Sequence, residues 1–188
     1  AYLWTNAEGK SSYYSGTGEA LDAFNLKSPL AFVRKTSDFG LRIDPFNRQW
    51  ANHQGIDLGA APGTEVFATA NGKVKFAGKQ GAYGNLIILE HANGYETYYG
   101  HLSNFSKNIE ANQAVKQGSV IAYVGSSGRA TAPHLHYELR KLSVPIDPEQ
   151  SFQSASQAKL QGQELAAFEK AIHRNTSQQL AKTSIQSR

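Results

Sequence analysis

The sequence predicts a mostly β fold, an antiparallel β-sheet groove with hairpins, followed by a C-terminal amphipathic helix. Seventeen glycines and 11% aromatic residues in a chain of 188 residues indicate short strands joined by tight turns. No long helical period occurs in the first 150 residues. With 40% apolar residues the chain can form one hydrophobic core. No window approaches the roughly 18 apolar residues that a membrane-spanning helix needs.

Short apolar runs between Gly, Pro and Asn residues predict the individual strands. We expect them at 33–38, 55–59, 65–68, 72–77, 86–91, 95–100, 120–124 and 134–140. The segment Ala92-Asn93-Gly94 separates two of these runs and predicts a β-hairpin, because Asn and Gly accept the left-handed backbone of tight turns.

The composition divides the chain into three segments. Residues 1–31 are polar and rich in Tyr, Gly and Ser, with a helix-like run at 18–25, and are interpreted as a lead-in from an upstream part of a longer protein. Residues 32–150 form the predicted main domain. Residues 151–188 form a helical tail with Leu165, Phe168 and Ile172 at helical spacing. The sequence leaves open whether this helix packs on the body, pairs with another chain or frays.

The net charge of +4 does not indicate a nucleic-acid-binding protein. Residues 1–150 carry 14 Lys and Arg against 13 Asp and Glu, whereas residues 151–188 carry 5 against 2. Most of the excess therefore belongs to the tail. No basic cluster is interleaved with aromatic residues, so we predict no nucleic-acid partner.

The chain has no cysteine and six histidines, so a metal site would have to use His, Asp, Glu or water. Around Ile56 and Leu58, apolar residues alternate with polar or small ones. On one extended strand this alternation would place His53 and Asp57 on the same face, with Gly55 leaving room between them. The two side chains could then converge on a cation.

A second cluster lies at 134–140, where the period is two. Leu135, Tyr137 and Leu139 are predicted to face the core, which leaves His134 and His136 on the other face. Both histidines could bind one metal ion, or one could bind it while the other contacts its water. Spacing does not decide between these arrangements.

The other three histidines are interpreted singly. His101 ends the second strand of the predicted hairpin, behind an aromatic run, and is a third candidate for the site. His91 is interpreted as a turn or surface residue, and His173 as a solvated residue of the tail helix.

Taken in order, these motifs resemble the LytM/lysostaphin-type zinc metallopeptidase family. The resemblance covers about residues 32–147, and Ala132 departs from it because glycine usually precedes the Pro-His-Leu-His run. The matching blocks are Ser37-Asp38-Phe39-Gly40-Leu41-Arg42, His53-x3-Asp57, Pro62-Gly63-Thr64, Tyr83-Gly84-Asn85, His91-Ala92-Asn93-Gly94-Tyr95, Tyr99-Gly100-His101-Leu102, Gly125-Ser126-Ser127-Gly128-Arg129 and Pro133-His134-Leu135-His136-Tyr137-Glu138.

The resemblance implies a role for each candidate residue. His53, Asp57 and His136 would hold one Zn²⁺ ion and leave a fourth position for water or substrate. His134 would be the general base, and His101 would stabilise the tetrahedral oxyanion.

The resemblance also implies a substrate class, peptidoglycan stem peptides and their cross-links. The D-alanyl-diaminopimelate bond is favoured because residues 13–16 and 26–30 resemble the lead-in of Gram-negative members. Groove loops at 44–50 and 79–83 would set the preference. Two alternatives stay open: a catalytically weak peptidoglycan-binding or amidase-activating module, and a glycyl-glycine endopeptidase. The expected location is the periplasm or cell envelope of a Gram-negative bacterium, with a monomeric protein and envelope regulators as further partners.

Overall fold

The computed structural model describes residues 1–5, 11–20, 26–107, 109–156 and 160–186. The chain divides into two compact units. The larger unit is Leu26–Phe152, and the smaller unit combines Ala1–Asn25 with Gln153–Arg188.

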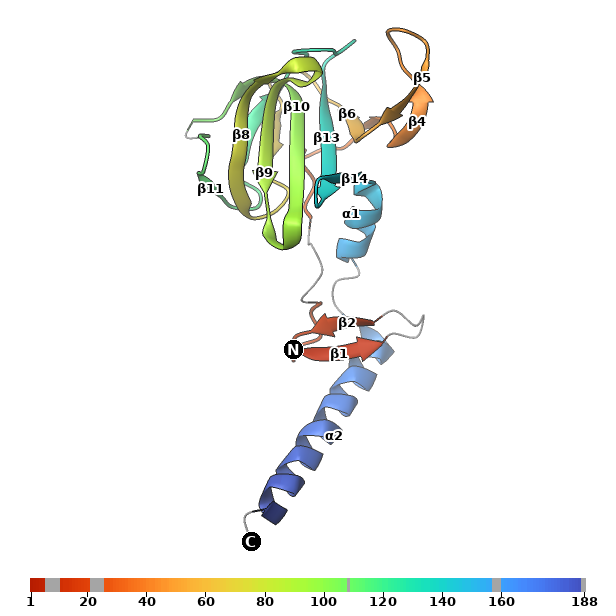
Figure 1. The fold of residues 1–188 in the computed structure, drawn as a ribbon, viewed down its shortest axis with the longest axis vertical. Helices are drawn as coiled ribbons and strands as arrows, with labels where there is room; N and C mark the ends of the chain where they lie inside the picture. Colours follow the sequence, from red (N-terminus) through yellow and green to blue (C-terminus); the bar gives the residue numbers. More distant parts are fainter. Residues whose placement is uncertain (6–10, 21–25, 108, 157–159, 187–188) are drawn as a thin grey trace. The chain divides into compact units, whose positions relative to one another are not determined.

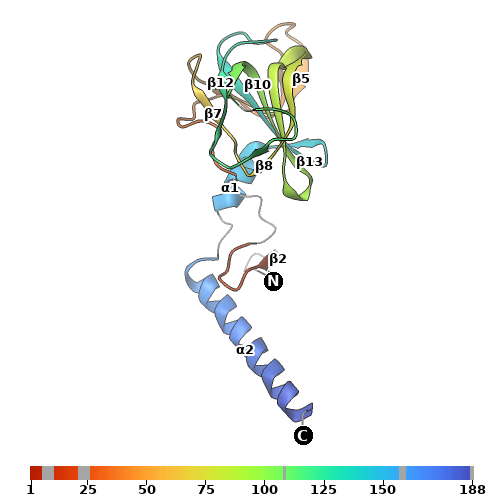
Figure 2. The ribbon, with the colours of Figure 1, turned by 90° about the vertical axis from the view of Figure 1, so that its left-hand side faces the viewer.

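The larger unit is built on one ten-stranded sheet in which the strands pair antiparallel (Figure 1). The main path runs β11-β8-β9-β10-β13-β6-β3, with β14 paired to β13. Figure 2 shows β7 and β12, which pair with each other, while β12 also pairs with β10. This architecture confirms the predicted fold class. The strands are β3 (Lys35–Ser37), β6 (Ile56–Gly59), β7 (Glu65–Phe67), β8 (Gly72–Gln80), β9 (Gly84–Glu90), β10 (Tyr95–Phe105), β11 (Ala114–Val115), β12 (Val120–Val124), β13 (His134–Lys141) and β14 (Val144–Ile146).

The predicted hairpin is formed by β9 and β10, and Asn93 and Gly94 have positive φ angles of 59° and 72° at its turn. His91 precedes this turn, and its partly buried ring is hydrogen-bonded to Asn71 O and Thr97 Oγ1 at 2.8 and 2.7 Å. His91 is therefore a turn residue whose ring has a structural role.

Strand β10 continues beyond the predicted end at Gly100. Its first half pairs with β9 and β13, and its second half pairs with β12 after register shifts around residues 99–104. His101 has a φ angle of 60° at this transition. The residue therefore interrupts the alternation of side chains along β10, which is why the period of two in the sequence ends there.

A second sheet consists of β4 (Gly40–Ile43) and β5 (Trp50–His53), which were not predicted as strands. His53 ends β5, whereas Asp57 lies in β6, so the prediction of one continuous strand through both residues was wrong. Gly55 lies at the break between the two strands, where a Cβ atom would overlap the carbonyl oxygen of Tyr137. Gly55 thus allows the backbone between β5 and β6 to approach β13 closely. This role is additional to the predicted one of leaving room between His53 and Asp57.

The hydrophobic core lies within the larger unit. The predicted inward face of β13 is confirmed, because Leu135, Tyr137 and Leu139 are fully buried. Phe152 of α1 (Pro148–Ser156) stacks on Tyr137 with ring centroids 5.9 Å apart.

The smaller unit contains a hairpin of β1 (Tyr2–Thr5) and β2 (Ser11–Tyr14), together with α2 (Gly162–Gln186). Phe168 of α2 is buried against the rings of Tyr2, Trp4 and Tyr14. The predicted apolar face of the tail helix thus packs on this hairpin, and His173 is exposed as predicted. Of the helix-like run at 18–25, residues 18–20 form a bend and an isolated bridge, and 21–25 lie outside the described residues.

No helix in the described part of the chain is long and apolar enough to cross a membrane.

Candidate active site

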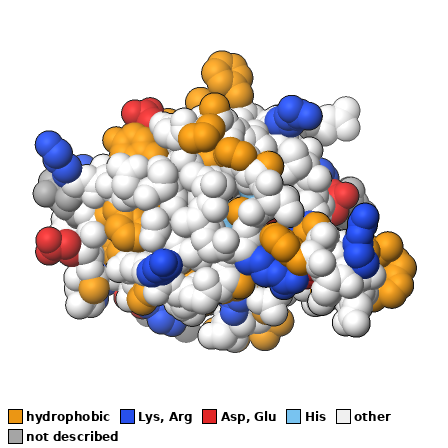
Figure 3. All heavy atoms as spheres, turned by 90° about the horizontal axis from the view of Figure 1, so that it is seen from above, with side chains coloured by type: hydrophobic (Ala, Val, Ile, Leu, Met, Phe, Trp, Pro, Cys, Tyr) orange, Lys and Arg blue, Asp and Glu red, His pale blue; other side chains and the backbone are white. Residues whose placement is uncertain are grey.

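One pocket of the larger unit contains all the residues that the sequence singled out for chemistry. Figure 3 shows it as a hollow with histidine atoms at its floor and basic and hydrophobic side chains around it. The five predicted site residues that line it are His53, Asp57, His101, His134 and His136.

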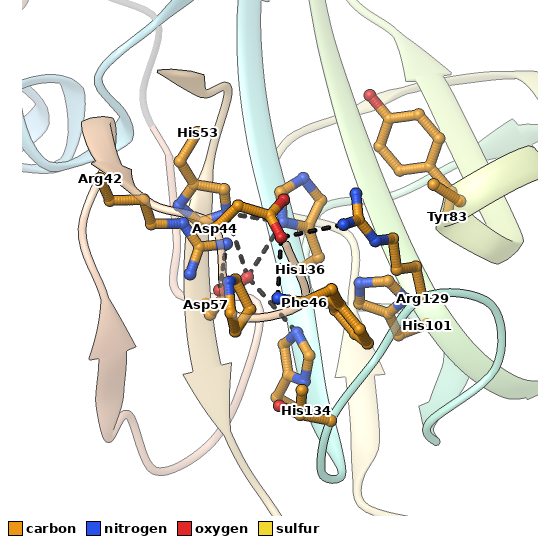
Figure 4. A pocket seen from close by; sticks show the side chains of 13 residues that line it. Arg42, Asp44, Phe46, His53, Asp57, Tyr83, His101, Arg129, His134 and His136 are labelled. Carbon is orange, nitrogen blue, oxygen red and sulfur yellow. Dashed lines mark hydrogen bonds and ion pairs between the residues drawn. The ribbon is translucent and has the colours of Figure 1, made fainter. Parts of the chain in front are cut away.

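Three of these residues form a group that could hold a metal ion. Ligand atoms of His53, Asp57 and His136 all lie within 4.8 Å of one another. Asp57 Oδ1 is 3.2 Å from His53 Nε2 and 3.0 Å from His136 Nδ1 (Figure 4). Antiparallel pairing of β6 with β13 places Asp57 directly opposite His136, and His53 reaches the same point from the end of β5.

The other nitrogen of each imidazole is held by a hydrogen-bond acceptor. His53 Nδ1 donates to the carbonyl of Asp38 at 2.7 Å, and His136 Nε2 donates to Glu138 Oε1 at 2.9 Å. In the neutral rings, Nε2 of His53 and Nδ1 of His136 therefore carry lone pairs. These lone pairs converge with the Asp57 carboxylate, and a bound cation would stabilise the three electron-rich atoms. The donor set fits a divalent ion such as zinc.

His134 and His101 lie beside this group. His134 Nδ1 donates to the carbonyl of Ala132 at 2.8 Å, which leaves Nε2 3.4 Å from Asp57 Oδ1. Because Ala132 contributes its backbone carbonyl, the departure from glycine at this position removes no contact from His134. His101 Nδ1 donates to the carbonyl of Ser127 at 2.8 Å, and its ring centroid lies 4.7 Å from that of His134.

The surroundings set different protonation preferences for these groups in the metal-free site. Burial by itself would raise the pKa of Asp57, but hydrogen bonds from His134, His136 and His53 outweigh it and hold the pKa well below its usual range. Burial lowers the pKa of His101 to about 4. Burial also acts to lower the pKa of His134, but its hydrogen bond to Asp57 dominates and raises it. At neutral pH His134 is therefore the stronger base of this pair.

Glu138 is a site residue to which the sequence analysis gave no role. Its carboxylate is 1% exposed and accepts hydrogen bonds from His136 Nε2, from Tyr83 OH at 2.7 Å and from Arg140 Nε at 2.7 Å. The period of two places Glu138 on the face of His136, so the signal was present. What the sequence did not indicate is that this second face of β13 is also buried.

Arg42 is a second residue that was missed. Its Nη2 atom lies 3.3 Å from Asp57 Oδ2, and its Nη1 atom donates to Ser37 Oγ at 2.9 Å. Arg42 belongs to β4, in the sheet that the sequence did not predict. Its positive charge lies next to Asp57 Oδ2, the carboxylate oxygen that does not face the histidines.

Comparison with known proteins gives consistent matches. Residues 51–148 match Peptidase family M23. The DD-carboxypeptidase/endopeptidase Mpg of Neisseria meningitidis is 48% identical over 125 residues, which is 66% of this chain and 28% of that protein. The peptidoglycan DD-endopeptidase ShyC of Vibrio cholerae is 36% identical over 138 residues, 73% of this chain and 31% of that protein. The chain thus spans less than a third of the length of these relatives.

Among solved structures, a zinc-containing peptidase from Vibrio cholerae superimposes with a TM-score of 0.64 at 31% identity. The match covers 80% of this chain and 45% of that one.

Proposed function

The chain belongs to peptidase family M23, and from this membership we propose that it is a zinc-dependent endopeptidase that hydrolyses peptide cross-links of bacterial peptidoglycan. The observation that carries the proposal is the convergence of His53, Asp57 and His136 in one pocket with two further histidines.

Each residue of the site has a proposed task. His53 Nε2, Asp57 and His136 Nδ1 would hold the zinc ion, which when bound lowers the pKa of water toward neutrality and polarises the scissile carbonyl. His134 would act as the general base at Nε2, because Ala132 keeps the proton of the neutral ring on Nδ1. The proton taken from water can then pass from His134 to the leaving amine nitrogen.

The geometry adds a condition to the oxyanion role of His101. The Ser127 carbonyl can only accept, so neutral His101 carries its proton on Nδ1 and has a lone pair on Nε2. Donation from Nε2 to an oxyanion therefore requires the imidazolium form. We propose that negative charge developing on the carbonyl oxygen raises the lowered pKa of His101, so that the ring takes up a proton from solvent and donates it from Nε2 to the oxyanion.

The substrate we propose is the D-alanyl-diaminopimelate cross-link, cleaved in the periplasm or cell envelope of a Gram-negative bacterium. It is supported by the names of the relatives, which are DD-endopeptidases or DD-carboxypeptidase/endopeptidases of Neisseria and Vibrio. No observation on the described residues favours the two alternatives, the binding or amidase-activating module and the glycyl-glycine endopeptidase.

Digestion of purified diaminopimelate-type sacculi, followed by mass spectrometry of the products, tests the proposal. Cross-linked dimers should be converted to monomers by the zinc-loaded protein and not by His136→Ala or His101→Ala variants. Zinc content should fall in the His136→Ala variant only. Intact sacculi despite bound zinc would favour the binding module. Cleavage confined to glycine-bridged sacculi would favour the glycyl-glycine endopeptidase.

A further inference from the structure

Arg129 lines the pocket, yet none of the roles described above uses it. Its side chain is 44% exposed, so the guanidinium is accessible from the pocket. A positive charge next to a peptidase site is a candidate for substrate recognition, provided that the side chain is held in place.

The side chain of Arg129 is held by two residues of the β4–β5 hairpin tip. Its Nη2 atom donates to Asp44 Oδ1 at 2.9 Å, and its Cζ atom lies 4.5 Å from the ring centroid of Phe46 (Figure 4). Asp44 Oδ1 also accepts hydrogen bonds from the backbone nitrogens of Phe46 and Asn47 at 2.8 and 3.2 Å. The acceptor that orients the guanidinium is therefore itself fixed.

The backbone of Arg129 is fixed as well. Its nitrogen donates to the carbonyl of Ala82 at 2.8 Å. The preceding Gly128 packs directly on Gly84, so a Cβ atom on either glycine would overlap the backbone of the other segment. Arg129 is thus preorganised in both backbone and side chain, which lowers the entropy lost on binding a ligand.

A guanidinium has five N–H donors in a planar fork, and Asp44 accepts from one nitrogen, Nη2. The remaining donors suit a carboxylate, which arginine binds in a bidentate, charge-assisted manner. The other arginine of the pocket, Arg42, is engaged by Asp57 and Ser37. Arg129 is therefore the arginine in the pocket that is placed to receive an anionic group of the substrate.

The proposed substrate carries such a group close to the reacting atoms. Diaminopimelate is a diamino diacid, so the carbon that bears the scissile amide nitrogen also bears a free carboxylate. This carboxylate must enter the pocket with the bond that is cut, whereas other carboxylates lie further along the stem peptides. We propose that Arg129, oriented by Asp44 and Phe46, binds the carboxylate on the leaving side of the scissile bond and thereby selects such bonds. The inference rests on the proposed function.

The proposed role of Arg129 is tested with two synthetic cross-linked peptides. They are identical except that the carboxylate beside the scissile nitrogen is free in one and replaced by a carboxamide in the other. The unmodified protein should cleave the free acid with a kcat/KM about 10- to 100-fold higher, as expected for a hydrogen-bonded charge pair. The Arg129→Gln variant should bring this ratio close to one. Arg129→Lys should keep part of the preference, because it retains the charge without the planar fork.

Lys73→Gln is the matched control, since it removes a positive charge from the surface of the same unit at a β8 residue that pairs with Glu90 and does not line the pocket. It should keep the full preference for the free acid. Three results would overturn the inference: cleavage of both peptides at similar rates by the unmodified protein, an equal loss on both peptides in Arg129→Gln, or a preference that depends on a carboxylate of the other stem. Failure to cleave either peptide with zinc bound would instead overturn the proposed function on which the inference depends.

Discussion

At the scale of single residues, the site is organised by the atoms that hold the far side of each imidazole. Carbonyls of Asp38, Ala132 and Ser127 fix His53, His134 and His101, whereas His136 is fixed by a carboxylate. Glu138 therefore differs from the other three acceptors, because a substitution can remove it. It also keeps the His136 ring oriented with Nδ1 toward Asp57.

We expect Glu138→Gln to lower zinc affinity by about 10- to 100-fold, because the amide is a weaker acceptor for His136 and no longer neutralises Arg140. Competition titration with a chelator measures this affinity. Glu96→Gln is a control, since Glu96 pairs with Lys75 on the surface and should leave zinc affinity unchanged. Equal affinity of the Glu138→Gln variant and the unmodified protein would contradict the positioning role.

Acid should weaken both zinc binding and activity. Burial acts to lower the pKa of His136, but hydrogen bonds to Asp57 and Glu138 outweigh it and raise the pKa above its usual 6.5 in the metal-free site. Zinc must displace that proton. The affinity for zinc should therefore rise with pH and level off once the pH exceeds the raised pKa of His136. Activity should fall as the pH drops through the raised pKa values of His134 and His136, which lie above the usual 6.5, because both rings must be neutral to act. A flat kcat/KM from about pH 5 to 8 would contradict this prediction.

At the scale of elements, the pocket depends on two places where the backbone is unusual. The first is the contact of Gly84 with Gly128, which have φ angles of 66° and 73° and join the start of β9 to the loop that carries Ser127 and Arg129. The second is His101 in β10, whose φ angle of 60° is strained for a residue with a Cβ atom.

The Gly84→Ala substitution should destabilise the protein by about 2 kcal/mol or more and lower activity, because its methyl group would overlap the backbone of residues 127–128. Gly63→Ala is the matched control: its φ angle is 83°, but nothing lies within 4 Å of the added atom. The free energy of unfolding of this control should fall by only about 1 kcal/mol, the cost of holding an alanine at a positive φ angle. Denaturant unfolding of both variants compares the two losses, and equal losses would show that the close contact does not matter.

The His101→Gly variant should be more stable than His101→Ala by about 1 kcal/mol, since only glycine adopts the observed φ angle without strain. Both variants should lose most of the activity, by about 100-fold or more, if His101 stabilises the oxyanion. Thermal unfolding and kcat together separate the two effects. Greater stability of the alanine variant would show that the backbone at residue 101 relaxes once the histidine is removed.

At the scale of the whole molecule, every residue of the candidate site belongs to the larger unit, Leu26–Phe152. The main core cluster also lies within this unit, and the partly buried Phe152 packs against it on Tyr137. The unit therefore contains what a zinc site needs in order to form.

A fragment of residues 26–152 should fold and bind zinc with the affinity of the full chain. Its rate on sacculi tests whether residues 153–188 act on the site: an unchanged rate would exclude an inhibitory role for the tail. A fragment that ends at residue 150 should be less stable, because it lacks the ring of Phe152. Loss of zinc binding in the fragment 26–152 would contradict the independence of the larger unit.

The sequence by itself determined the β fold class, the hairpin at Asn93-Gly94, the inward face of β13 and the residues able to hold a metal. These features depend on a period of two, on turn chemistry and on donor type, all of which are local. The sequence missed β4 and β5 because their large apolar residues are exposed, including Leu41, Ile43 and Trp50.

Only the tertiary structure decided which imidazole nitrogen faces Asp57, that Glu138 is buried behind His136, and that Arg129 reaches Asp44. Asp57 and His136 are 79 residues apart, and Asp44 and Arg129 are 85 apart. Their contacts depend on which strands pair and on where loops from different sheets meet. Local periodicity carries no information on such pairings, so the chemistry of the site was readable from the sequence while its orientation and its proposed selectivity required the fold.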